Sequence, residues 1–273
     1  MSKAELQTLK AAEFEIANEK ERERFAFALL DCLASPDPEL RDKIAYEAYV
    51  ALMRGEYLDA EVVRRLGGDL IAILQKEESD PNGFEKPFAA LVLAEVARTD
   101  RVGDTLNDEG RQALVDAAGA YLTSVTDYRG FDETEGWRHG VAHTADLAMQ
   151  LAFNTKTSAA QLQSLREAVM VQIIPDTTHF YIYGEPARLA RPILVMAMNE
   201  AFTEEEWTAW FAALADPAPL KNWGEAYESK RGLARLHNLK AFGQAVYVNA
   251  DASENEKLKV LVPPALELLR ALP

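Results

Sequence analysis

The stretch from Asp127 to Asp146 carries the side chains whose types and spacing could do chemistry. It contains two of the chain's four histidines, His139 and His143, followed by Asp146. In a helix, 100° per residue places His143 about 40° from His139 and Asp146 about 20° on the other side, so the three would share one stripe. Two imidazoles and a carboxylate are ligands that a divalent transition metal accepts. The spacing therefore allows a metal site.

Such a metal would support a hydrolase. His139, His143 and Asp146 would hold the ion, and an acidic neighbour, Asp127 or Glu135, would activate water. A zinc peptidase of the His-Glu-x-x-His type is not supported, because Gly140 stands where the glutamate would be.

Two other interpretations stay open beside the metal site. A groove without metal would bind a peptide, a protein or a small molecule among Asp127, Arg129, Trp137, His139, His143 and Asp146. Alternatively, the same residues form a hydrogen-bonded network that organises a helix and the loop before it. The loop is crowded with carboxylates, so a cation or a basic partner is favoured there; they are Asp127, Asp132, Glu133 and Glu135.

Helices must position these residues, because apolar side chains recur at three- and four-residue spacing along the chain, as in Phe25, Leu29 and Leu33. Capping signals support this: Ser158 with Gln161, Thr203 with Glu206, and Ser253 with Glu256. Only 179–183 has strand character, and an extended loop explains it equally well. The predicted helices are 2–16, 19–34, 38–54, 59–76, 85–99, 108–124, 137–153, 158–174, 186–199, 203–215, 223–249 and 253–271, the last broken near Pro263 and Pro264.

About twelve helices without a sheet predict an all-α fold. The segment Ser35–Ala45 resembles the opening of a HEAT-type repeat, with a capped turn followed by Leu40 and Arg41. No fixed repeat period is present elsewhere, so the first expectation is an irregular HEAT-like α-α superhelix or solenoid, and the second is a compact helical bundle. No linker divides the sequence, and residues 1–273 are expected to form a single all-helical domain.

Composition narrows the functional classes. The 273 residues include 29 basic and 44 acidic side chains, a formal charge of −15, and 48% are hydrophobic. This acidic, folded protein is not expected to bind nucleic acid or an anionic membrane surface. The single cysteine, Cys32, cannot form an internal disulfide. Residues 1–16 lack the apolar stretch of a secretory signal, and no apolar run is long enough for a membrane span. The expected location is the cytoplasm.

The motif around the histidines resembles the signature of a bacterial family called domain of unknown function 2785. It consists of Asp127, Arg129, Gly130, Phe131, Gly136, Trp137, His139, Ala142, His143, Ala145 and Asp146. Softer similarities at 35–46, 84–93, 185–190 and 238–247 extend the resemblance over about residues 25–250. Phe131 departs from the usual tyrosine, and Lys86-Pro87 from the usual helix entry. The resemblance implies an all-helical fold and transfers no activity, so whether the protein is an enzyme stays undecided.

The leading functional hypothesis is a binding or scaffold protein with a polar groove around the His139 and His143 helix. The alternative is the metal-assisted hydrolase described above.

Overall fold

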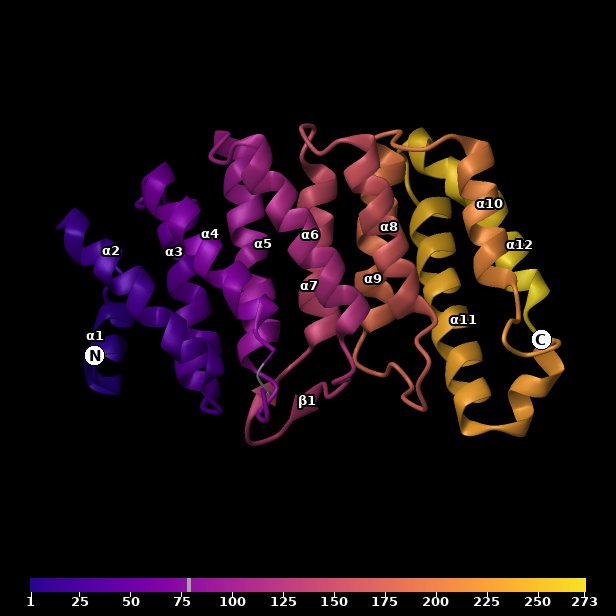
Figure 1. Cartoon of the computed structure of the whole chain (residues 1–273), viewed down its shortest axis with the longest axis horizontal. Helices are drawn as coiled ribbons and strands as arrows, with labels where there is room; N and C mark the ends of the chain where they lie inside the picture. Colours follow the sequence, from indigo (N-terminus) through magenta and orange to yellow (C-terminus); the bar gives the residue numbers. More distant parts are fainter. Residues whose placement is uncertain (78–79) are drawn as a thin grey trace. The chain divides into compact units, whose positions relative to one another are not determined.

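The computed structural model describes residues 1–77 and 80–273 (Figure 1). Contacts between residues divide the chain into two compact units, Met1–Lys156 and Thr157–Pro273, and we describe each by itself. The single domain over residues 1–273 stays a prediction.

The first unit contains the helices α1 to α7. Their bounds are α1 (Lys3–Ala11), α2 (Glu19–Ala28), α3 (Glu47–Arg54), α4 (Ala60–Gln75), α5 (Glu85–Gly103), α6 (Asp108–Ser124) and α7 (Gly140–Phe153). A 3-10 segment, η1 (Leu29–Ala34), and a π-helical segment, η2 (Glu39–Tyr46), connect α2 to α3. Two short strands, β1 (Phe131–Asp132) and β2 (Gly136–Trp137), form a hairpin between α6 and α7 (Figure 1).

The second unit contains the helices α8 (Ala159–Ile173), α9 (Glu185–Met198), α10 (Glu204–Ala215), α11 (Lys230–Asp251) and α12 (Val262–Ala271). Two 3-10 segments, η3 (Trp223–Glu228) and η4 (Glu256–Leu261), precede α11 and α12. Here α11 packs against α9, α12 and η3. Pro263 and Pro264 lie in the first turn of α12, where a missing amide donor costs least, and the helix is interrupted just before them as predicted.

The capping signals explain several helix starts. Ser158 with Gln161 and Thr203 with Glu206 form the predicted capping boxes, each satisfying two free amides. The prediction for Ser253 was wrong: Asn255 caps η4, and the Ser253 hydroxyl accepts the amide of Asn255 instead. The residue that caps this segment therefore lies two positions later in the sequence than predicted.

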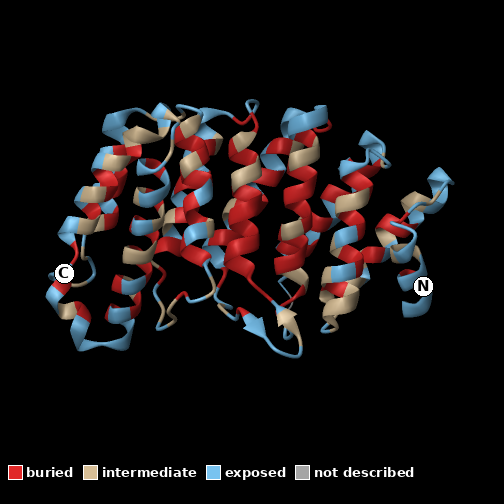
Figure 2. Ribbon diagram, turned by 180° about the vertical axis from the view of Figure 1, so that it is seen from behind, coloured by how far each residue is buried: buried red, intermediate tan, exposed pale blue. Residues whose placement is uncertain are grey.

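The core of the first unit lies along α5 and α7, which pack against each other and are mostly buried in Figure 2. Every residue from Gly140 to Ala148 is buried. Small residues such as Ala142 and Ala145 permit this close approach, and a helix that is apolar on nearly all sides belongs in a core. His143, Thr144 and Asp146 are therefore enclosed with the apolar residues around them.

The all-helical prediction is confirmed, since the described residues form helices with only one two-residue strand pair. The segment 179–183 is an extended loop without strand pairing. The predicted helix 137–153 begins too early, because Trp137 pairs with Phe131 in the hairpin and the helix starts at Gly140. His139 has left-handed backbone angles, φ 60° and ψ 37°, so the stripe drawn from helical spacing does not include it.

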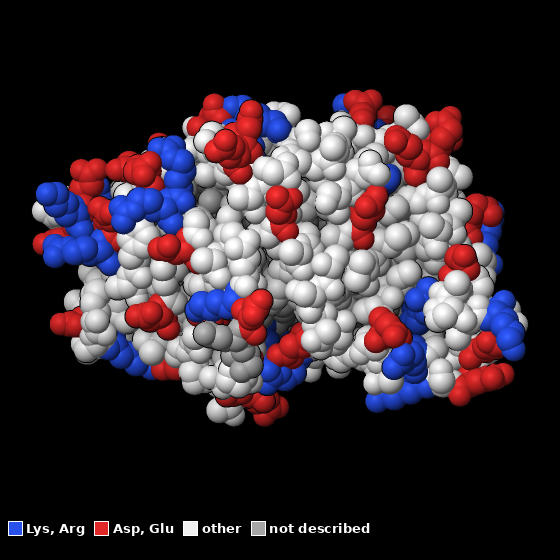
Figure 3. Space-filling view, in the orientation of Figure 1, with Lys and Arg blue, Asp and Glu red and all other residues white. Residues whose placement is uncertain are grey.

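Two surface properties bear on function. In the part of the chain that the structure describes, no helix is both long and apolar enough to cross a membrane. Acidic and basic side chains are interspersed on the face drawn in Figure 3, so that face carries no large patch of a single sign.

Candidate functional site

The hairpin loop, residues 126–139, is shaped by one carboxylate and one glycine. Asp132 Oδ1 accepts the amides of Thr134 and Glu135 at 2.8 and 2.9 Å, which closes the turn and lowers the pKa of Asp132. Gly136 has a φ of +76°, and a Cβ there would lie 3.2 Å from both Arg41 Nη2 and Pro38 Cβ. Glycine is thus needed where the hairpin lies against η2.

Two arginines anchor this hairpin to α5. Arg41, which is fully buried, donates from Nη2 to the backbone oxygen of Glu135 at 2.7 Å. Arg138 donates to the backbone oxygen of Asn82 at 2.7 Å and pairs with the Glu135 carboxylate at the same distance. The two guanidinium carbons lie 3.9 and 4.3 Å from the centroid of the Phe84 ring. One aromatic ring therefore contacts both cations.

Asp127 and Arg129 pair within the loop. Arg129 donates to both Asp127 oxygens, with an Nη2 to Oδ2 distance of 2.6 Å. Burial alone would raise the pKa of Asp127, but hydrogen bonds from Arg129 leave the pKa of this carboxyl below its ordinary value. Gly83 permits the pair to come close, because a Cβ there would lie 2.4 Å from Asp127 Oδ2. The ion pair between Asp127 and Arg129 thus accounts for the presence of glycine at position 83.

Four aromatic side chains form a continuous contact from the surface to the core. The Trp137 ring stacks on His139, with centroids 4.6 Å apart and an angle of 23°, and His139 meets the edge of His143 at 5.8 Å. His143 then packs edge-on against Phe88 at 5.1 Å. The backbone turns from the hairpin into α7 through a left-handed conformation at His139, which histidine adopts more readily than most residues.

His143 has a defined hydrogen-bond partner on α5. Its Nδ1 lies 3.1 Å from the backbone oxygen of Pro87, so Nδ1 carries the proton in this contact, since a carbonyl only accepts. The His139, His143 and Asp146 side chains are 9%, 6% and 8% exposed. Among the described residues, no group of three or more His, Cys, Asp or Glu side chains is placed to hold a metal ion. The three-ligand metal site stays a prediction that this geometry does not support.

The structure thus places five of the six sequence-predicted residues in two sets and the sixth, Asp146, elsewhere on α7. Trp137, His139 and His143 are in contact through their rings, and Asp127 with Arg129 forms an ion pair. Asp146 lies buried on α7, further along the helix. Sequence reasoning left Arg41, Phe84 and Arg138 out of the site. Arg41 stands in the Ser35–Ala45 motif and could have been noticed there. Its partner, the backbone oxygen of Glu135, lies 94 residues away, so local sequence patterns carry no sign of the contact.

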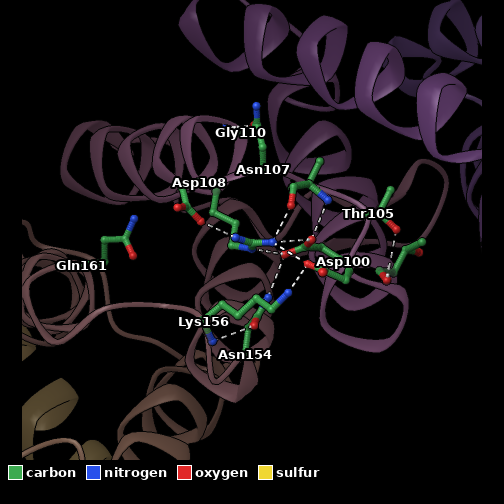
Figure 4. Close-up of polar contacts among 12 residues, drawn as sticks. Asp100, Thr105, Asn107, Asp108, Gly110, Asn154, Lys156 and Gln161 are labelled. Carbon is green, nitrogen blue, oxygen red and sulfur yellow. Dashed lines mark hydrogen bonds and ion pairs between the residues drawn. The ribbon is translucent and has the colours of Figure 1, made fainter.

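A second polar cluster, also missed, joins three helix ends (Figure 4). Buried Arg111, on α6, pairs with buried Asp100, on α5, at 2.8 Å, and also with Asp104 and Asp108. Asn154, at the end of α7, donates to Asp100 at 2.8 Å, and Lys156 pairs with Asp104. Burial alone would lower the pKa of Arg111, but its hydrogen bonds to Asp100 raise that pKa. Every group is satisfied within the cluster, which makes it a structural clamp.

Helices packed around α5 and α7, with an anchored aromatic hairpin at the start of α7, define an all-helical protein whose polar site is built from a loop. A family model described as "Protein of unknown function (DUF2785)" matches residues 70–248. The chain belongs to this family, and the match contains the whole hairpin loop and α7. The segment Ser35–Ala45 lies outside it. Searches of curated proteins and of solved structures each found no match.

Proposed function

We propose that the protein is a binding protein that recognises a partner protein or peptide with basic side chains, and that the hairpin loop is its contact surface. This keeps the binding hypothesis made from the sequence and replaces the groove by a projecting loop. The predicted HEAT-like arrangement of helices and cytoplasmic location fit the proposal and remain predictions.

The observation that carries the proposal is an exposed aromatic pair on an anchored hairpin. Phe131 is 46% exposed and Trp137 37% exposed, and their ring centroids are 5.0 Å apart. Leaving two large rings in water costs free energy that a partner would recover. Aromatic side chains with few rotatable bonds are the residues that most often dominate binding energy. The Arg41 and Arg138 contacts to the loop reduce the entropy lost on binding.

The charge of the loop selects the partner. Asp132 and Glu133 are exposed, and the hydrogen bonds that lower the pKa of Asp132 keep it charged at neutral pH. The nearby arginines are engaged: Arg129 with Asp127, and Arg138 with Glu135. The remaining exposed charge beside the aromatic pair is negative, which favours Lys or Arg next to apolar residues in the partner.

A displayed library of random peptides tests the proposal. Peptides selected on the protein should combine basic and apolar residues, bind more weakly as salt concentration rises, and lose at least about tenfold in affinity against Phe131→Ser. Tyr57→Ser is the matched control, because Tyr57 is also 46% exposed in the first unit and lies far along the chain from the hairpin. Peptides that bind Phe131→Ser as tightly as the native protein would contradict the proposal.

The alternative of a metal-assisted hydrolase at His139, His143 and Asp146 has no geometric observation in its favour. It predicts about one equivalent of transition metal in purified protein, and loss of that metal in His139→Ala. Metal analysis of protein produced in supplemented medium decides between the two functions.

A further inference from the structure

A cavity of about 290 Å³ lies in the first unit beside α5 and α6. It is lined by the turn that precedes α5 and by the end of α6; the residues that bear polar side chains are Asp80, Lys86, Tyr121, Ser124, Thr126 and Asp127. Its size is at the lower end of the range for small-molecule sites, so it suits a compact ligand.

Tyr121 gives this cavity a polar group that the protein itself does not satisfy. Only 9% of the residue is exposed, and it forms part of the cavity wall. Its hydroxyl forms no hydrogen bond within the described residues, whereas the Ser124 hydroxyl uses the Tyr121 backbone oxygen. The hydroxyl is therefore available to exchange hydrogen bonds with a ligand in the cavity.

The charges around this hydroxyl favour a cation. Burial raises the pKa of Tyr121, and the negative charges of Asp80 and Asp127 raise it further, so these two carboxylates favour a cation over an anion beside the hydroxyl. Lys86 also lines the cavity, but its ammonium donates to the backbone oxygen of Lys76. Arg129 is held by Asp127 and does not form part of the wall.

Both carboxylates are fixed in place by donors from the protein, but only Asp80 has accepting capacity to spare. The Asp80 oxygens accept the amides of Gly83 and Lys86, at 2.9 and 3.3 Å. The Asp127 oxygens accept four hydrogen bonds from Arg129. Since a carboxylate has about four accepting positions, Asp80 keeps positions for a donor in the cavity.

We infer that this cavity binds a small organic ammonium ion, whose N–H groups donate to Asp80 and the hydroxyl oxygen of Tyr121. The inference does not depend on the hairpin's partner, because neither Phe131 nor Trp137 lines the cavity.

Calorimetry with three ligands of the same chain length tests the chemistry: butylammonium, 1-butanol and butyrate, in phosphate buffer to avoid a competing amine. Butylammonium should bind at least about tenfold more tightly than the other two, and more weakly at high salt. Equal binding of butanol would show a merely apolar cavity, and preference for butyrate would show that Lys86 dominates. Displacement of butylammonium by stoichiometric Mg²⁺ would assign the cavity to a metal ion. Each of these results overturns the inference.

Two variants test the location. Tyr121→Phe removes only the hydroxyl and should weaken butylammonium binding about tenfold without lowering the melting temperature, because no protein partner is lost. Asp80→Asn should weaken it similarly. Asp116→Asn, which removes an exposed carboxylate from the same helix α6, should bind like the native protein. Unchanged affinity in Tyr121→Phe would contradict the inference. Phe131→Ser should bind normally, which separates this test from that of the proposed function.

Discussion

Arg41 Nη2 lies 2.7 Å from the backbone oxygen of Glu135, across 94 residues of sequence. The same guanidinium donates to the backbone oxygen of Ser35 at 2.8 Å and rests on the Phe84 ring. One side chain thus connects the loop before η2, the start of α5 and the hairpin.

Replacing Arg41 by lysine should destabilise the first unit by about 2–4 kcal/mol, because an ammonium cannot reproduce the forked donors and leaves buried groups unsatisfied. Denaturant unfolding measures the change, and proteolysis within residues 126–138 should become faster. Arg65→Lys is the control, because Arg65 also lies over an aromatic ring, Phe27, and pairs with Glu23, but is half exposed. Its change should stay below about 1 kcal/mol. Equal effects at both positions would contradict the anchoring role of Arg41.

His143→Phe should destabilise the protein by about 1–3 kcal/mol. The new ring keeps the contact with Phe88, but the donor to the Pro87 oxygen is lost. Thermal unfolding in the presence and absence of a chelator measures the cost. The structural network predicts the same cost in both conditions, whereas a bound metal would make the native protein sensitive to the chelator.

Asp100→Asn should cost about 3 kcal/mol, because Arg111 would keep its buried charge without its buried partner. Arg111→Met and the double variant complete a cycle, whose coupling energy should exceed about 1 kcal/mol. Asp108→Asn changes a fully exposed partner of the same arginine and should be nearly neutral. Additive effects of Asp100→Asn and Arg111→Met would show that the ion pair does not clamp the three helix ends.

Asp127 gives the stability of the protein a defined pH dependence. Its pKa is lower in the folded state than in the unfolded chain, so its contribution is complete above the unfolded pKa of about 3.9 and is lost as pH falls through the folded value. Asp127→Asn should therefore lower the free energy of unfolding at pH 7 by less than about 1 kcal/mol, since the pair is half exposed. The difference from the native protein should shrink as pH falls below about 3.9 and vanish once the native carboxyl is protonated, and a difference that grows in acid would contradict this sign.

Local sequence signals predicted the helices well. The predicted helix 108–124 has the same bounds as α6, because Asn107 caps its start and apolar spacing runs its whole length. The predicted start of the helix 137–153 is three residues too early, because the two-residue strand β2 is too short to produce a periodic pattern. The contacts of Arg41 and the surroundings of the Tyr121 hydroxyl depend on segments far apart in sequence. Spacing along one helix therefore predicted the bounds of α6 but could not reveal the cavity beside Tyr121.

The left-handed residue His139 has a mechanical consequence. Strand β2 ends at Trp137 and α7 begins at Gly140, so only Arg138 and His139 separate them. Both connecting residues are fixed by contacts. Arg138 is hydrogen-bonded to Glu135 and Asn82, and the His139 ring packs between Trp137 and His143. A displacement of the Trp137 ring is therefore transmitted directly to the buried helix α7, because no flexible linker separates the two.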